Sequence, residues 1–146
     1  MTREQRIEML KAIYRTLPTM ECRGLCQVCC GPVCMTRFER DRIEKHLGDK
    51  PVDHMGLACP VLNDAGRCSA YAVRPLICRL WGMVESLKCP HGCEPSRWLT
   101  DDEAAGLLAA MNAVGGDAVM FGLDEDDTRN VISELRSVRA QKCSQS

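Results

Sequence analysis

Apolar side chains recur at helical spacing in five segments of this chain, with charged residues between them. The segments are residues 2–16, 36–47, 75–80, 100–115 and 124–141. Apolar positions three or four residues apart form one face of a helix, so each segment is predicted to be a helix packed by that face. The pattern therefore favours a mainly α fold: a small single domain of about five helices.

Two of these helices carry explicit start signals. Thr36 and Glu39, and again Thr100 and Glu103, have the spacing of a capping box. In a capping box the threonine side chain and the glutamate satisfy each other's backbone amides at the first turn. Gly48 supplies a stop after the first of these helices. Both segments are therefore predicted to begin sharply.

The stretches between these helices lack periodicity and hold most of the cysteines. Residues 18–35, 48–72 and 89–93 are rich in Cys, Gly and Pro. We expect irregular loops stabilised by metal, because nothing in their pattern specifies regular structure. Ten of the eleven cysteines precede residue 98. This predicts a cysteine-cluster metal-binding unit over residues 1–98, including the N-terminal helix, and a helical hairpin over 99–146.

Composition favours metal over disulfides. The chain has 146 residues, eleven cysteines and only 4% aromatic residues. Few large side chains are therefore available for a hydrophobic core, and small domains of this kind usually add disulfides or metal. The first eight residues are charged and polar, unlike a secretory signal, and no apolar run approaches the roughly 20 residues of a membrane helix. The cysteine count is odd, which full disulfide pairing cannot satisfy. We therefore expect a cytoplasmic protein with reduced cysteines and no membrane partner.

The charge pattern argues against nucleic acid. Lys and Arg less Asp and Glu give +3 over residues 1–50, +1 over 51–98 and −5 over 99–146. No stretch shows the clustered basic residues of a nucleic-acid surface. The acidic last third is a solvated helix face or a docking surface for a protein partner.

The candidate metal ligands are closely spaced thiols, which several loops can turn toward one point. Zinc and iron–sulfur clusters both use four such sulfurs. Because the strong candidates number more than four, either they form more than one site, or some of them surround the bound ligands or are reactive thiols. A weaker signal extends the set near His91, whose own ligation is less favoured. The strong candidates are Cys22, Cys26, Cys29, Cys30, Cys59, Cys68 and Cys78, and the weaker ones are Cys89 and Cys93. Cys34 and Cys143 are predicted to be incidental.

Two arginines flank one of the candidate ligands. Arg74 and Arg79 lie on either side of Cys78. A four-thiolate centre is anionic, so guanidinium groups beside it would offset charge and donate hydrogen bonds to sulfur. The alternative is that they pair with surface carboxylates. Tyr71, in the same motif, is expected to be a core or hydrogen-bonding residue.

Together these motifs resemble a known family. The order Cys22-x3-Cys26-x2-Cys29-Cys30, then Cys59-Pro-x-Leu, Cys68-x2-Tyr71 and Arg74-Pro-x2-Cys78-Arg79 is similar to the YkgJ-type cysteine-cluster family over residues 22–93. That family is a zinc- or iron-chelating domain related to one in the flagellin lysine methylase. The resemblance implies chelation by the seven strong candidates. One departure is Gln27, where a glycine often follows the second cysteine.

Two classes of function remain open at this point. The first is a small metal-binding protein that holds an iron–sulfur cluster, most simply 4Fe-4S, or Zn²⁺. Its role would be accessory, electron-transferring or as an interaction module. The alternative is a cluster-dependent enzyme, for group transfer or redox chemistry, that uses a surplus cysteine such as Cys30. The sequence identifies no catalytic residue.

Overall fold

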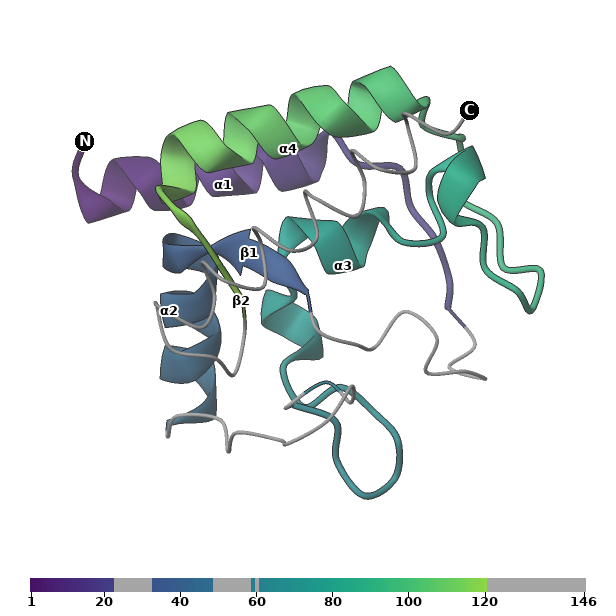
Figure 1. Cartoon of the computed structure of the whole chain (residues 1–146), viewed down its shortest axis with the longest axis horizontal. Helices are drawn as coiled ribbons and strands as arrows, with labels where there is room; N and C mark the ends of the chain where they lie inside the picture. Colours follow the sequence, from purple (N-terminus) through teal and green to yellow (C-terminus); the bar gives the residue numbers. More distant parts are fainter. Residues whose placement is uncertain (23–32, 49–58, 60, 121–146) are drawn as a thin grey trace, which may run out of the picture.

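Four helices and a two-stranded sheet make up the regular structure in the residues described by the computed structural model. These residues are 1–22, 33–48, 59 and 61–120. The elements in chain order are α1 (Arg3–Arg15), β1 (Cys34–Thr36), α2 (Arg37–Leu47), α3 (Leu76–Leu80), α4 (Asp101–Gly115) and β2 (Ala118–Met120) (Figure 1). Two single 3₁₀ turns, η1 (Tyr71–Val73) and η2 (Glu85–Leu87), lie on either side of α3.

The mainly helical prediction is confirmed in its coarse form. Four predicted helices are present within a residue or two of their expected ends, and the fifth, at 124–141, lies outside the described residues. The small sheet was not predicted. β1 and β2 have three residues each and pair antiparallel, with Met35 opposite Val119. Strands this short show no alternation that a sequence pattern could reveal.

The helix starts follow the predicted capping chemistry. Both expected capping boxes form: the Thr36 and Thr100 hydroxyls accept from the amides of Glu39 and Glu103, whose side chains accept in return. Thr2 and Gln5 form a third box, at the start of α1. Threonine therefore begins each of the three longer helices in the described residues, and α3 begins after a proline instead.

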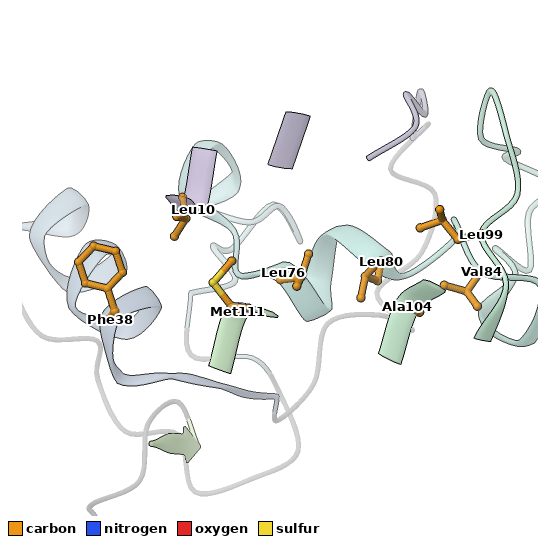
Figure 2. Packing of buried hydrophobic residues seen from close by; sticks show 8 residues of the cluster. All are labelled: Leu10, Phe38, Leu76, Leu80, Val84, Leu99, Ala104 and Met111. Atoms are coloured by element: carbon orange, nitrogen blue, oxygen red, sulfur yellow. The ribbon is translucent and has the colours of Figure 1, made fainter. Parts of the chain in front are cut away.

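The larger hydrophobic core lies where α1 and α4 run side by side over α3 (Figure 1). Leu10 of α1, Leu76 and Leu80 of α3, and Met111 of α4 are almost completely buried there. The cluster extends from Phe38 at one end to Val84 and Leu99 at the other, as Figure 2 shows. Apolar packing of four helices therefore specifies this half of the molecule.

A second, smaller core lies around the sheet. Its buried members come from β1, α2, the segment after residue 60, and β2: Met35, Ile43, Val61, Ala70 and Val119. The C-terminal end of α4 meets this region at Gly115, where a β-carbon would lie on the Thr36 side chain. Only glycine allows that approach, so Gly115 fixes how closely α4 packs on the start of α2.

No helix in the described residues is long and apolar enough to cross a membrane. The predicted boundary near residue 98 stays a prediction, and the larger core contains Leu10 before it and Met111 after it.

Candidate metal centre

Cys68 lies at one end of a hairpin-like turn, and Cys59 lies three residues before the other end, Leu62. Leu62 and Cys68 form an antiparallel bridge, and the Ser69 amide donates to the Val61 carbonyl oxygen over 2.9 Å. Gly66, with φ of 73°, provides the tight turn between them. Both cysteines are half-buried and pack against the smaller core. The turn and the smaller core thus place two cysteines, nine positions apart in sequence, at the edge of one cluster.

Cys22 and Cys93 each lie two residues from a second antiparallel bridge, between Met20 and Pro95. The Ser96 amide donates to the Thr19 carbonyl oxygen over 2.7 Å, and the Ser96 hydroxyl accepts from the Thr19 amide over 3.0 Å. Continued by two residues, this register sets Cys22 opposite Cys93. Cys22 is exposed, and Cys93 is 8% exposed.

Cys89 lies beside the same bridge. Gly82 has φ of 88°, and a β-carbon there would lie 2.9 Å from the Met20 methyl carbon and 4.0 Å from the Cys89 β-carbon. A turn closed by the Gly92 amide and the Cys89 carbonyl oxygen, 3.2 Å apart, leads from Cys89 to Cys93. The weaker candidates therefore occupy a hydrogen-bonded turn next to the segment that carries Cys22, with His91 exposed at its tip.

Cys78 lies on α3, between its two buried leucines. Leu76 and Leu80 face the larger core, and a residue two positions from each points about 200° around the helix from it. Cys78 is therefore directed away from the α1 and α4 layer. It is half-buried.

The flanking arginines make specific contacts with tyrosines and backbone carbonyls. Arg79 stacks over the Tyr14 ring at 4.0 Å and donates to the carbonyl oxygens of Arg74 and Ala72, at 2.9 and 3.1 Å. Arg74 stacks over the Tyr71 ring at 3.7 Å and donates to the Tyr71 carbonyl oxygen at 3.1 Å. Tyr71 is 52% exposed, so its expected place in a core is wrong: it supports the arginine at the surface. These contacts fix the backbone before Cys78.

A buried carboxylate holds this motif to the rest of the fold. Glu39 is 3% exposed, and its Oε1 accepts from the Leu76 amide, the first of α3, at 2.7 Å. Its Oε2 accepts from the Thr36 amide and hydroxyl, both at 2.9 Å. The Tyr14 hydroxyl lies 3.5 Å from Oε1 and 3.2 Å from the Arg74 carbonyl oxygen. One side chain therefore joins α1, α2 and α3.

Tyr14 is electrostatically part of this group. Its burial, reinforced by the Glu39 carboxylate, raises the pKa of Tyr14 to about 12, against a smaller opposing effect of Arg79 and Arg42. Burial disfavours the charged phenolate, and a neighbouring negative charge disfavours it further. Tyr14 therefore stays protonated as a hydrogen-bond donor throughout the neutral range.

Part of the predicted ligand set lies outside the described residues: Cys26, Cys29 and Cys30, together with the incidental Cys143. Within residues 1–22, 33–48, 59 and 61–120, no three Cys, His, Asp or Glu side chains come close enough to hold a metal. The described cysteines lie mainly in two regions: Cys59 and Cys68 at the edge of the smaller core, and Cys22 and Cys93 on either side of the Met20–Pro95 bridge. Cys34 is half-buried on β1.

The donor chemistry fits zinc or an iron–sulfur centre. Thiolates are the ligands that both prefer, and both take four. Two pairs on separate backbone supports, with Cys89 beside one of them, match a centre that is completed by further cysteines. When bound, such a metal would cross-link these segments, and an iron–sulfur cluster would also carry electrons.

Sequence reasoning missed two features of this site. The bridge that brings the segment of Cys22 beside that of Cys93 joins residues 75 positions apart, and local spacing gives no sign of it. The hydrogen bond from the Leu76 amide to Glu39 was not predicted, because the capping box already accounted for a glutamate at this position. Glu39 directly follows the apolar Phe38 and lies four positions before Ile43, which puts it on the buried side of α2, and this placement was the available signal.

The family of this chain is given by comparison with known proteins. No curated protein and no solved structure matches this chain. A family model does match, over residues 21–94, and its description is CxxCxxCC, putative zinc- or iron-chelating domain. The spacing in that name holds here from Cys26 onward, whereas three residues separate Cys22 from Cys26. Because the match covers half of the chain and contains the paired cysteines just described, the chain belongs to this CxxCxxCC family.

Proposed function

We propose that this protein binds an iron–sulfur cluster or zinc through cysteine thiolates and acts as an accessory, electron-transfer or interaction module. The observation that carries the proposal is the placement of Cys22 and Cys93 beside the Met20–Pro95 bridge, and of Cys59 and Cys68 at the edge of one core, inside the segment matched by the family model. Thiols brought together in pairs from distant segments are what a tetrathiolate centre needs.

The ligand set we propose joins the described pairs to the cysteines of the 22–30 motif. Cys22, Cys26, Cys29 and Cys30 are close in sequence, and the Met20–Pro95 bridge lies two residues before the first of them. Cys93 and Cys89 are the nearest described thiols on the other side of that bridge. We assign Cys59, Cys68 and Cys78 to the same centre or to a second one. Nine thiolates are more than one four-sulfur centre uses.

Arg74 and Arg79 support the centre through the backbone in this proposal. Their stacking on Tyr71 and Tyr14 and their bonds to carbonyl oxygens hold the segment before Cys78 in place. The positive charge of each guanidinium would also favour an anionic thiolate centre that includes Cys78. Replacing Arg79 with lysine keeps the charge and loses the planar stack, so it separates these two contributions.

The proposed partner is another protein, met through the acidic last third of the chain. Residues 99–146 carry a charge of −5, and three acidic residues lie in the first turn of α4. A cytoplasmic setting keeps the thiols reduced and able to ligate metal.

The test is metal content in matched cysteine variants. The protein is purified anaerobically, its absorption spectrum is recorded and its zinc, iron and sulfide are measured. Cys59→Ser with Cys68→Ser, and separately Cys22→Ser with Cys93→Ser, should each lower bound metal, while Cys143→Ser should not. Visible absorbance with iron and sulfide identifies a cluster, and a colourless protein with zinc identifies the other metal. Unchanged metal in both pairs would refute the ligand assignment.

A further inference from the structure

A cavity unrelated to the cysteines opens between the start of α1 and the outer side of α2. Its volume is about 340 Å³, close to the lower end of the roughly 300–1,000 Å³ typical of small-molecule sites. Its walls are Met1, Arg3 and Arg6 from the N-terminal segment and Phe38, Asp41 and Arg42 from α2. None of these residues belongs to the cysteine motif.

Three guanidinium groups dominate the charge of this cavity. The lining residues include Arg3, Arg6 and Arg42 but only one acidic residue, Asp41. Arginines on the walls of one small cavity repel each other unless an anion lies between them. Guanidinium is also the group whose planar fork matches carboxylate and phosphate oxygens with two parallel hydrogen bonds.

Arg42 adds a second and independent observation. Its Nη1 atom is buried and has no hydrogen-bond partner among the residues that the structure describes. A buried charged donor left without an acceptor is costly, so native structures nearly always supply one. Asp41 precedes Arg42 directly in the chain and is exposed, and it does not satisfy this nitrogen. An acceptor oxygen brought by a ligand would do so.

Phe38 gives the cavity an apolar wall. It is 8% exposed and belongs to the larger core, so its ring is held firmly in place. A fixed aromatic wall beside charged groups suits a ligand with an apolar body and an anionic end.

We propose that this cavity binds a small organic anion, a carboxylate or phosphate monoester joined to an apolar or aromatic body. Arg42, Arg6 and Arg3 receive the anionic end, and Phe38 packs against the body. A nucleic-acid or membrane phosphate is the less favoured occupant. The site is small and has an acidic residue on its wall, whereas a phosphate backbone needs an extended basic surface.

The experiment measures binding of phenyl phosphate, benzoate and inorganic phosphate to the full chain by calorimetry. The aromatic anions should bind, and phenyl phosphate should bind more tightly than inorganic phosphate. Arg42→Gln should weaken binding by about tenfold or more, as expected for loss of a charge-assisted hydrogen bond. The choice between phenyl phosphate and benzoate then identifies the anionic group that the cavity prefers.

Matched variants separate a built site from general charge attraction. Arg6→Gln and Arg15→Gln each remove one positive charge from α1, but only Arg6 lines the cavity. Arg6→Gln should weaken binding clearly and Arg15→Gln by less than about twofold. If Arg42→Gln does not fold, the comparison of Arg6→Gln with Arg15→Gln still tests whether the cavity binds the anion. Equal weakening by the two α1 variants would overturn the proposal. Absence of binding by both aromatic anions, or Arg42-dependent binding of only an oligonucleotide or anionic vesicles, would overturn it too.

Discussion

The two hydrophobic clusters of this protein are held together in different ways. The larger one joins α1, α3 and α4 with Phe38 of α2, and fully buried Leu, Val and Met side chains make up most of it. The smaller one has five buried residues, and Cys59 and Cys68 line its edge where a larger core would have Leu or Ile. The helical half has enough apolar surface to specify itself. The cysteine half, by which we mean the loop segments that carry the cysteines, depends on turns, isolated bridges and, in our proposal, a bound metal.

The comparison also shows how the two halves are joined. Glu39 and Thr36 lie between the clusters, and both are almost completely buried. Polar groups at such a position are tolerated only when their hydrogen bonds are complete, and the Glu39 carboxylate accepts from Thr36 and from Leu76. The junction between the two clusters is therefore held by specific hydrogen bonds and not by apolar packing alone. Small changes there should cost more than similar changes on either outer surface.

Metal removal is the largest expected effect and acts on the cysteine half. Structural zinc in small domains contributes on the order of 10 kcal/mol to folding. We expect a chelator to lower the denaturant midpoint strongly and to split the transition, with the helical half unfolding later. Denaturant curves followed by far-ultraviolet circular dichroism, with and without chelator, measure this. A single unshifted transition would contradict the difference between the halves.

Glu39→Gln tests the junction between the clusters. The amide can replace only one of the two carboxylate oxygens as acceptor, so a donor from Leu76 or Thr36 is left buried. We expect a loss of about 3 kcal/mol in the free energy of unfolding. Glu103→Gln is the matched control, because Glu103 has the same capping-box position in α4 but is exposed. Equal losses in the two variants would show that the junction is not special.

Gly115→Ala probes the close approach of α4 to β1. The new methyl group would meet the Thr36 β-carbon and hydroxyl, and we expect a cost of about 2 kcal/mol. Gly106→Ala in the same helix meets nothing within 4 Å, and should instead stabilise by roughly 0.5–1 kcal/mol. Thermal melts of both variants compare them directly. Destabilisation by Gly106→Ala, or none by Gly115→Ala, would refute this packing.

The smallest expected effect is the alkaline loss of stability linked to Tyr14. Its pKa is raised to about 12 in the folded protein, so its contribution is complete below the unfolded value near 10 and fades as pH rises toward 12. At pH 11 the loss amounts to about 1.4 kcal/mol. Unfolding curves at pH 9 and pH 11 measure it. Tyr14→Phe should remove this component while Tyr71→Phe, at an exposed ring, should keep it.

How far the sequence predicts the structure differs between the two halves as well. The helices follow from apolar spacing and from threonine caps, both local signals, so their ends are predicted closely. The β1–β2 pairing and the Met20–Pro95 bridge join residues 75 or more positions apart, and no local pattern specifies them. Gly115 shows a similar limit. Its place as a helix stop is readable, but its contact with Thr36 depends on how the helices pack.

The most direct test of the central claim is hydrogen exchange on the anaerobically purified protein, before and after chelation. The account predicts that the Ser69 and Gly92 amides, which donate to Val61 and Cys89 in the cysteine half, lose protection when metal is removed. The Ala104 amide at the start of α4, which donates to Thr100, should keep its protection. Unchanged exchange at Ser69 and Gly92, or an equal loss at all three amides, would contradict it.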